Sequence, residues 1–325
     1  MAEVKLEATF NMLGAKGTIE DFIMKDKNKT ELTLKSGQYA LVTGGSRGIG
    51  VEIVKMLMQS DIHVIVGCRN VTAGEKLKTD IREQGILTGE LSCFQLDVGS
   101  IKSVLAFSDK IKERYTKIHT LVNNAGIMFV PYTETDEGFE SQFAVNYLGH
   151  FLLTHLLMPL LKVAGSESET NARIVNVSSI AHHATEINFE DINMKKQYIS
   201  TGAYGQSKLA QVMFTKYCQT LFNNLQMPVQ VHSVHPGIVN TDIFNGTPIK
   251  TLFPWLPGLI FKNPIQGATS VVYACVSPKL EGAGGTYISN CKVRKPSKAA
   301  DSLENQEKLF EMSKAMVGIE EFGKP

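Results

Sequence analysis

The feature of this sequence that most constrains its fold is a regular alternation, from Gln38 onward, of short apolar runs with longer helical segments. The apolar runs are near-continuous and rich in β-branched residues, which is typical of strands covered by helices on both faces. Strands that alternate with helices are joined by right-handed crossovers and form a parallel sheet. Strands are expected at residues 39–42, 62–66, 91–96, 118–122, 172–177 and 229–234, and helices at 49–59, 72–83, 100–115, 136–161 and 203–221.

The length of the chain favours a single domain. It has 325 residues, 43% of them hydrophobic, and shows neither an internal repeat nor a low-complexity linker. A chain of this length can bury one large core, and we predict an α/β fold with a doubly wound parallel sheet of about seven strands over residues 38–325. Residues 1–37 are expected to form an N-terminal extension on the surface of this domain. They are polar and of mixed charge, without the apolar run of a signal peptide or a membrane span.

The charge and the cysteines exclude several classes of function. The net charge of +1, without a basic or acidic block, argues against attraction to nucleic acid or to an anionic surface by bulk charge. The five cysteines are irregularly spaced and form no CxxC pair, so neither a disulfide framework nor a zinc site is expected. The eight histidines show no trio spaced like metal ligands, and His182 and His183 are expected at the rim of a pocket. We therefore predict a cytoplasmic protein without a bound metal.

A glycine-rich turn at residues 43–50 (TGGSRGIG) directly follows the first expected strand and opens the first helix. Its glycines allow a tight turn, a close approach to a pyrophosphate, and close packing of strand against helix. The helix N-terminus then presents free N–H groups to the phosphates. An ordinary glycine-rich loop is the alternative, but the position after the first strand favours the dinucleotide site of a Rossmann fold. Contacts are expected from Gly44, Ser46, Arg47, Gly48, Ile49 and Gly50.

The residues after the second expected strand indicate which dinucleotide is bound. A site selective for NAD places a carboxylate there to bind the ribose 2′-hydroxyl. This chain has Arg69 in that place, and Arg47 lies in the glycine-rich turn. Two guanidinium groups can clamp a 2′-phosphate through charge-assisted hydrogen bonds. We therefore expect NADP(H) as the cofactor; the alternative is that both arginines are solvated surface residues.

Further cofactor contacts are expected where the other strands end. The Asp97 carboxylate, after the third strand, can accept a hydrogen bond from the adenine amino group. Residues 123–126 (NNAG), after the fourth, can pass beneath the nicotinamide ribose, although each of these two features is also compatible with a structural role. Residues 235–241 (HPGIVNT), after the sixth, can wall the nicotinamide, and Thr241 can bond its carboxamide. These contacts are expected from Asp97, Val98, Asn123, Ala125, Gly126, Pro236, Gly237, Val239 and Thr241.

Tyr204 and Lys208 form a YxxxK pair at the start of an expected helix. Residues four apart share one face of a helix, so the Lys208 ammonium can lie beneath the Tyr204 phenol. A free tyrosine has a pKa of ~10, and a nearby cation favours the phenolate. The oxidised nicotinamide would add positive charge nearby, and together the two charges would let Tyr204 exchange a proton with an alcohol or a carbonyl near neutral pH. Lys208 can also hold the ribose hydroxyls of the nicotinamide nucleotide, so both residues are expected in the cofactor site.

Two further polar residues complete a candidate catalytic set. Ser179 lies just past the end of the fifth strand, further out than Ser178, where its hydroxyl can orient the substrate oxygen toward Tyr204. Asn146 lies among apolar residues in the fourth helix, and a buried asparagine needs partners. It could hold a water that passes protons from Lys208 to solvent. The alternatives are serines that cap a loop and an asparagine that packs between helices.

An apolar segment at residues 252–261 (LFPWLPGLIF) follows these motifs. Pro254 and Pro257 interrupt it, and it is too short to cross a bilayer. We expect it to form a lid over an apolar substrate. The alternative is a patch that rests on a membrane or on a partner protein.

Taken together, these motifs resemble the short-chain dehydrogenase/reductase family over roughly residues 38–290. Within the family, the phrases at 123–128 (NNAGIM), 146–154 (NYLGHFLLT) and 173–183 (RIVNVSSIAHH) resemble the retinol dehydrogenase group. Many members of that group begin with a hydrophobic membrane anchor, and residues 1–37 contain no such run. This departure argues against a membrane-embedded enzyme specific for retinoids.

The resemblance implies a role for each candidate residue: Tyr204 as the catalytic acid or base, Lys208 as its partner, Ser179 as the substrate binder and Asn146 as the relay. It implies hydride transfer between NADP(H) and a lipophilic alcohol/carbonyl pair, such as a retinoid, an isoprenoid or another long-chain compound. The alternative is a non-catalytic sensor or scaffold that binds NADP(H). The expected partners are the substrate, the surface of an intracellular membrane or lipid droplet, and a second copy of the chain, but not nucleic acid.

Overall fold

A single eight-stranded sheet forms the centre of the protein in the computed structural model, which describes residues 2–244 and 255–324. The strand order is β3-β2-β1-β4-β5-β6-β7-β8, with seven parallel strands and an antiparallel edge strand β8. This confirms the predicted doubly wound parallel sheet, and β8 is the addition to the expected seven. The strands are β1 (Tyr39–Thr43), β2 (His63–Cys68), β3 (Glu90–Gln95), β4 (Thr120–Asn123), β5 (Ala172–Val177), β6 (Val229–His235), β7 (Thr286–Ser289) and β8 (Lys292–Arg294).

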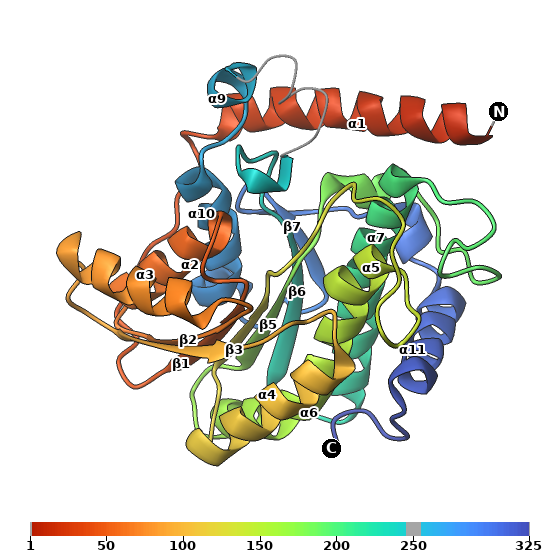
Figure 1. The fold of residues 1–325 in the computed structure, drawn as a ribbon. Helices are drawn as coiled ribbons and strands as arrows, with labels where there is room; N and C mark the ends of the chain where they lie inside the picture. Colours follow the sequence, from red (N-terminus) through yellow and green to blue (C-terminus); the bar gives the residue numbers. More distant parts are fainter. Residues whose placement is uncertain (1, 245–254, 325) are drawn as a thin grey trace.

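Helices cover both faces of the sheet (Figure 1). One face carries α2 (Ile49–Gln59), α3 (Val71–Glu83) and α10 (Pro264–Val276), and the other carries α4 (Ile101–Arg114), α6 (Gly149–Ser166), α7 (Ser200–Asn224) and α11 (Leu303–Val317). The shorter elements are α5 (Ser141–Phe143), η1 (Ala144–Leu148), η2 (Ile180–His183), η3 (Asp242–Phe244), α9 (Leu256–Ile260), η4 (Pro278–Leu280) and η5 (Lys298–Ala300).

Two hydrophobic cores result from this arrangement, one on each face of the sheet. In β1, Leu41 belongs to the core beneath α4, α6 and α7, whereas Ala40 and Val42 belong to the core beneath α2 and α10. Successive residues of a strand point to opposite faces, so a strand that is buried on both sides must be apolar at every position. This explains the near-continuous apolar runs from which the strands were predicted.

The region between β4 and α6 differs from its prediction. A single helix was expected over residues 136–161, but the helix begins only at Ser141, where the Glu140 carboxylate accepts hydrogen bonds from the N–H groups of Gln142 and Phe143. The chain then makes the π-helical turn η1 before α6 continues the helix. A π-helical turn inserts one residue into a helix and redirects the side chains around it, often at a functional site. This turn contains Asn146.

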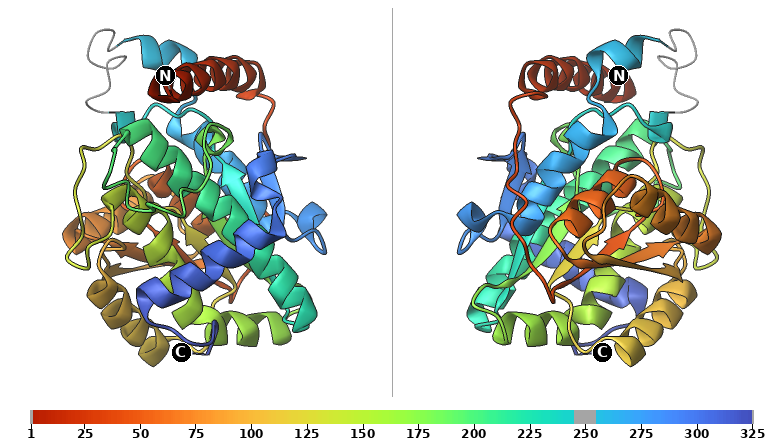
Figure 2. Two further views of the ribbon diagram at one scale, coloured as in Figure 1. Left: turned by 90° about the vertical axis from the view of Figure 1, so that its right-hand side faces the viewer. Right: turned by 90° about the vertical axis from the view of Figure 1, so that its left-hand side faces the viewer.

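The N-terminal extension contains a long helix, α1 (Ala2–Met24), that the sequence analysis did not identify. It lies across the carboxyl edge of the sheet, against η2 and α7 and next to α9 (Figures 1 and 2). Its apolar residues are spread around the helix rather than along one stripe, which hid the usual amphipathic pattern. The N-terminal extension thus has helical structure that the polar composition did not reveal.

One helical segment of the described chain, residues 141–166, has the length and apolar character of a membrane span, and 83% of its most apolar window is buried inside the protein.

Two helical glycines provide a test of this packing. Gly165 in α6 lies against β6, because a Cβ atom there would be 2.0 Å from the Pro228 carbonyl oxygen, whereas a Cβ on Gly14 in α1 would meet nothing within 4 Å. Gly165→Ala should lower the free energy of unfolding by at least about 2 kcal/mol through overpacking. Gly14→Ala should raise it by roughly 0.5–1 kcal/mol, because alanine favours the helix. Denaturant unfolding of both variants measures the contrast, and equal signs would contradict the packing of α6 on β6.

Candidate active site

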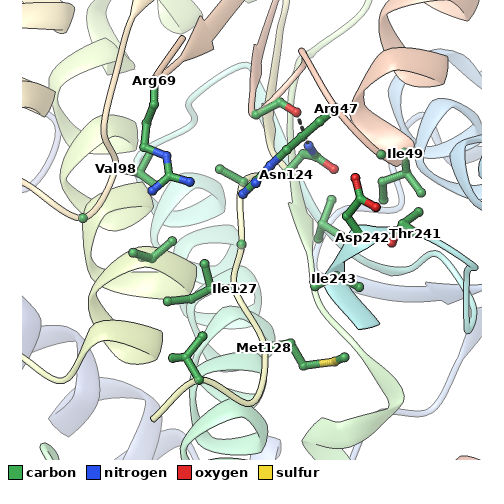
Figure 3. Close-up of a pocket in the computed structure, with 18 of the residues that line it drawn as sticks. Arg47, Ile49, Arg69, Val98, Asn124, Ile127, Met128, Thr241, Asp242 and Ile243 are labelled. Atoms are coloured by element: carbon green, nitrogen blue, oxygen red, sulfur yellow. Dashed lines mark hydrogen bonds between the residues drawn. The ribbon is translucent and has the colours of Figure 1, made fainter. Parts of the chain in front are cut away.

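A cavity of about 810 Å³ opens at the carboxyl edge of the sheet, where the loops after β1 to β6 meet (Figure 3). Open α/β sheets bind their ligands at this edge. The expected catalytic residue Ser179 lines the cavity. So do most of the residues expected to contact the cofactor, namely Gly44, Ser46, Arg47, Gly48, Ile49, Arg69, Asp97, Val98, Ala125, Gly126, Tyr204, Lys208, Pro236, Gly237, Val239 and Thr241.

The glycine-rich turn has a backbone that only glycine adopts readily. Gly44 and Gly48 have φ angles of +67° and +57°. A Cβ atom on Gly44 would lie 3.0 Å from the Ala125 Cα, so this turn is pressed against the turn after β4. No side chain of the described residues caps the N-terminus of α2, which leaves its first N–H groups for a ligand in the cavity.

Gly50 acts through packing and not as the expected contact to the dinucleotide. It does not line the cavity, and a Cβ atom at this position would lie 2.2 Å from the Gly44 carbonyl oxygen. The absence of a side chain therefore lets α2 start directly beneath the turn. This agrees with the packing role predicted for the last glycine of the motif and corrects its assignment as a contact residue.

The Thr43 hydroxyl connects the turns after β1 and β4. Its Oγ1 accepts hydrogen bonds from the N–H groups of Asn124 and Ala125, both at 2.9 Å, and lies 2.8 Å from Nε2 of the buried His150. Burial lowers the pKa of His150 to about 3, so its ring is neutral and its Nε2 can accept the hydroxyl proton. The sequence analysis missed this threonine, although its place at the end of β1 next to the glycines was a usable signal.

Asn123 was expected to contact the cofactor, but it is buried outside the cavity lining. Its Nδ2 donates to Asn176 Oδ1 in β5 at 2.8 Å and to Thr154 Oγ1 in α6 at 3.2 Å, so it ties adjacent elements together.

The next residue, Asn124, lines the cavity instead. Its Nδ2 donates to the Thr43 carbonyl at 2.8 Å, and its Oδ1 is buried without a partner among the described residues.

Two arginines project into the cavity from different sides (Figure 3). Arg47 comes from the glycine-rich turn, and Arg69 comes from the end of β2. Asn70, the residue after Arg69, accepts a hydrogen bond from the Ala73 N–H and caps α3. The end of β2 therefore presents a guanidinium group rather than a carboxylate to the cavity.

Tyr204, Lys208 and Ser179 meet at the inner end of the cavity. Tyr204 and Lys208 lie one turn apart on α7, with the Lys208 Nζ 5.6 Å from the centroid of the Tyr204 ring. The Ser179 hydroxyl lies near the Tyr204 phenol and lowers its pKa, and its Oγ accepts a hydrogen bond from the Ala181 N–H at 3.2 Å. The neighbouring Ser178 is buried and donates to the Lys208 carbonyl at 2.8 Å. The structure thus places Ser179 and not Ser178 beside the tyrosine.

The electrostatics of the free protein differ from what was expected for Tyr204. Burial raises the pKa of its phenol to about 12, and the hydrogen bond from Ser179 offsets this only in part. Burial also lowers the pKa of Lys208 to about 8, and its Nζ donates to the Val177 carbonyl at 2.9 Å instead of to the phenol. The predicted acidity of Tyr204 therefore needs the second of the two expected charges, that of the oxidised nicotinamide. In the free protein the tyrosine is a neutral phenol, the form that can donate a proton.

Asn146 is fully buried and lies behind the cavity lining rather than in it. Its side chain accepts from the Ile127 N–H at 2.8 Å and donates to the Ile127 carbonyl and to Ser207 Oγ, both at 2.9 Å. Its own carbonyl accepts from Gln211 Nε2 at 2.5 Å. These contacts give Asn146 a second role beside the predicted relay, because they fix the backbone that carries the turn after β4 toward Tyr204.

The two histidines after Ser179 were expected at the pocket rim, but His182 is fully buried. Its Nδ1 lies 2.6 Å from the Ser179 carbonyl, and its Nε2 accepts from the Ser297 N–H at 3.1 Å. Burial lowers the pKa of His182 to about 3, so the ring is neutral, as these two bonds require. His182 therefore holds the backbone of Ser179 against the C-terminal part of the chain.

Apolar side chains surround the open side of the tyrosine. Met128, Ile243 and Phe244 line the cavity, and the Phe129 ring packs edge-on against Tyr204 with centroids 5.4 Å apart. Of the segment predicted as a lid, residues 252–254 lie outside the described part of the chain. The remaining residues do not line the cavity, and Phe261 reaches it only indirectly, through a ring contact with Phe244 at 5.3 Å.

This arrangement has the parts of a nicotinamide-dependent oxidoreductase. A positive-φ glycine turn and a free helix N-terminus fit a pyrophosphate, and a paired serine and tyrosine beside a buried lysine fit proton exchange with an alcohol or a carbonyl. Among residues 2–244 and 255–324, no group of three His, Cys, Asp or Glu side chains is placed to hold a metal ion.

Comparison with known proteins assigns the family. Residues 38–250 match the short chain dehydrogenase family, and the chain belongs to it. Human polyprenol dehydrogenase is 39% identical over 285 residues, covering 86% of this chain and 85% of that protein. Mouse retinol dehydrogenase 12 is 37% identical, with 87% of each chain covered. A solved structure of an uncharacterized protein from Mycobacterium paratuberculosis has a TM-score of 0.72 and 28% identity, covering 89% of this chain and 97% of that one. The chain is therefore a short-chain oxidoreductase that binds a nicotinamide cofactor.

Proposed function

We propose that this protein interconverts a lipophilic alcohol and its carbonyl compound with NADP(H) as cofactor. The observation that carries the proposal is the group formed by Ser179, Tyr204 and Lys208 inside a cavity that also holds the glycine-rich turn. A sensor or scaffold would not need a buried tyrosine and lysine at this place. No contact in the described structure favours that alternative.

The proposed chemistry uses the hydroxyls of Ser179 and Tyr204. The bound nicotinamide supplies or accepts the hydride. In the direction of carbonyl reduction, both hydroxyls donate hydrogen bonds to the substrate oxygen, and Tyr204 then gives up its proton as the oxygen gains charge. In alcohol oxidation, the phenolate takes the proton back. Since burial keeps the Tyr204 phenol neutral in the free protein, the site is prepared as a proton donor.

Lys208 provides the positive charge that this proton transfer needs. With a pKa of about 8, it is largely protonated at neutral pH, although burial disfavours its charge. An ammonium near the tyrosine stabilises the phenolate left behind after proton donation. The lysine also lies within reach of the turn after β4, because a Cβ atom on Gly126 would be 3.6 Å from its Nζ. We therefore assign to Lys208 both the stabilisation of Tyr204 and the binding of the nicotinamide ribose.

Tyr204→Phe removes the proposed proton donor while keeping the ring. We expect kcat to fall by about 10²–10⁴-fold with a lipophilic aldehyde, whereas the affinity for NADPH stays the same. Stopped-flow turnover and fluorescence titration of NADPH measure the two quantities. Tyr273→Phe, on α10 across the sheet, is the matched control and should leave both unchanged. Undiminished turnover in the Tyr204 variant would refute the proposed role.

The preference for NADP(H) rests on Arg47 and Arg69. Both line the cavity, and β2 presents no carboxylate there to compete for the ribose. A guanidinium group forms paired, charge-assisted hydrogen bonds with a phosphate, which a 2′-hydroxyl cannot match.

Arg47→Ala and Arg69→Ala should each raise the KM for NADPH about tenfold to a hundredfold, since one charged hydrogen bond contributes about 1.5–3 kcal/mol. The KM for NADH should change little, because NADH lacks the 2′-phosphate. Steady-state kinetics with both cofactors gives the comparison, with Arg114→Ala at the far end of α4 as the control. A loss of the same size for NADH would show that the arginines do not recognise the 2′-phosphate.

A lipophilic substrate fits the open side of the site. The cavity lining includes the apolar side chains of Met128, Ile243 and Phe244, and the Phe129 ring packs against Tyr204. Relatives that act on polyprenol and retinol, as their names state, cover most of this chain. We propose a retinoid, an isoprenoid or another long-chain aldehyde or ketone as the substrate class.

Such a substrate is dissolved in lipid, and we propose that α1 and α9 rest on an intracellular membrane or lipid droplet. Met12, Ile19 and Phe22 project from one side of α1 with 65%, 63% and 51% of their surface exposed. Trp255, 63% exposed, and Leu259, 61% exposed, lie at the neighbouring α9. An apolar helix face with an adjacent tryptophan is typical of a protein that lies on a membrane surface. The protein would then be cytoplasmic and peripheral to the membrane.

The double variant Met12→Glu/Ile19→Glu should weaken binding to phosphatidylcholine vesicles by at least about tenfold, because each buried apolar side chain contributes about 1.5–3 kcal/mol. Vesicle flotation measures this, and turnover of a short, water-soluble aldehyde should not change. Leu87→Glu is the control, since Leu87 is 77% exposed but follows α3. Equal losses in the control, or no vesicle binding by the unmodified protein, would contradict the membrane contact.

A further inference from the structure

A carboxylate of the N-terminal helix is buried against the loop that follows β6. Asp21 of α1 is only 2% exposed. Its Oδ2 accepts a hydrogen bond from the Ile238 N–H at 2.7 Å, and its Oδ1 forms an ion pair with Lys262 Nζ at 3.0 Å. The Nε2 of His235, at the end of β6, lies 3.9 Å from the same carboxylate. Asp21 thus contacts both ends of the segment 235–238, which lines the cavity.

Lys262, the partner of Asp21, has no surface exposure. Its Nζ also donates to Asn290 Oδ1 at 2.7 Å, and Asn290 Nδ2 donates back to Asp21 Oδ1 at 3.2 Å. The three side chains therefore satisfy one another. Removal of a single partner would leave a charge buried without compensation, which destabilises a protein far more than removal of both.

The ion pair touches the cavity wall directly at Gly237. This glycine has a φ of +99°, and a Cβ atom on it would lie 2.6 Å from Lys262 Nζ and 2.9 Å from Asp21 Oδ2. The backbone of Lys262 holds the next residues, because its N–H donates to the Ile238 carbonyl and its carbonyl accepts from the Asn240 N–H, both at 2.9 Å. The segment 237–240 is consequently held by α1 on one side and by Lys262 on the other.

We propose that Asp21 and Lys262 are positioning residues for the cofactor, and that α1 is thereby a working part of the dinucleotide site. This inference rests on the proposed function, in which the segment 235–241 walls the nicotinamide. Two apolar side chains could fill the same space at no greater cost in stability. A carboxylate, however, also binds the Ile238 N–H, and this bond fixes the backbone next to two residues that line the cavity.

The neighbouring charges keep Asp21 ionised. Burial by itself raises the pKa of this carboxyl, but His235, Lys262 and the Ile238 N–H together lower it further, so the pKa lies below its ordinary value. Burial holds the pKa of His235 at about 4, so this ring is neutral at neutral pH and Lys262 carries the compensating positive charge.

The test compares a ligand that reaches the nicotinamide wall with one that does not. Isothermal titration calorimetry gives the Kd of each ligand. NADP⁺ is the whole dinucleotide, and adenosine 2′,5′-bisphosphate is the fragment that lacks the nicotinamide half. NAD⁺ and ADP form the matching pair without the 2′-phosphate. The variants are Asp21→Asn, which keeps the shape but not the charge, and Asp21→Leu/Lys262→Met, which removes both charges. Glu20→Gln is the matched control, because Glu20 of α1 pairs with Arg294 at 3.0 Å on the exposed surface.

We expect Asp21→Asn to weaken binding of the whole dinucleotide about tenfold, because it leaves the Lys262 ammonium beside Gly237 without its counter-charge, and to leave the adenosine fragment unaffected. The double variant should regain part of the thermal midpoint lost in Asp21→Asn, because no charge is left buried alone, but not the dinucleotide affinity, because leucine gives the Ile238 N–H no acceptor. Glu20→Gln should change neither ligand.

Two outcomes would overturn the inference. The first is an Asp21→Asn variant that binds the adenosine fragment and the whole dinucleotide equally more weakly, which indicates a general loss of structure. The second is a double variant that binds the fragment and the dinucleotide as tightly as the unmodified protein does. If the unmodified protein bound neither dinucleotide, the proposed function itself would fail. That result is distinguishable, because it does not depend on the variants.

Discussion

The hydroxyl of Thr43 is the interaction on which the site depends most. It lies at the end of β1 and binds two consecutive N–H groups of the turn after β4, while its proton goes to a neutral, buried imidazole. Because the glycine-rich turn begins at the next residue, this one side chain sets the separation of the two turns between which the dinucleotide must lie. The same imidazole of His150 lies 3.3 Å from the carbonyl of Asn146, so the bond network continues into the π-helical turn. A loss of register between β1 and β4 would therefore disturb both ends of the cavity.

Burial dominates the chemistry of the reacting groups. Tyr204 and Lys208 are both enclosed, and in the free protein their pKa values move toward their neutral forms. A low-dielectric environment also strengthens each interaction that forms within it. The positive charge of an oxidised nicotinamide would act on the tyrosine with little screening, and the acidity of Tyr204 is then coupled to the state of the cofactor. The sequence analysis expected the lysine and the oxidised nicotinamide to act together on Tyr204, and burial of both side chains makes the contribution of the cofactor the larger need.

Most of the fold was predictable from the sequence, because strands buried on both faces are apolar at every position and β5 was placed with its correct bounds. The catalytic pair was predictable because four residues make one helical turn. Asn123 and Asn124 could not be told apart, since adjacent residues of a strand point to opposite faces and nothing in the pair NN fixes which one faces the cavity. Helix α1 was missed because its apolar residues serve both an inner and an outer face. The pairing of Asp21 with Lys262 joins residues far apart in the chain, and neither has a local pattern that indicates it.

The bond from His182 to Ser179 has a consequence for the surroundings in which the protein can work. The rings of His182, His150 and His235 stay uncharged at neutral and mildly acidic pH, since burial lowers their pKa values to about 3 to about 4. The hydrogen bonds that orient the serine, the threonine and the loop after β6 are thus the same in mildly acidic and in neutral surroundings. Histidine, the usual pH sensor of proteins, serves here as a fixed structural connector. A mildly acidic organelle would therefore leave these three histidine connections in place.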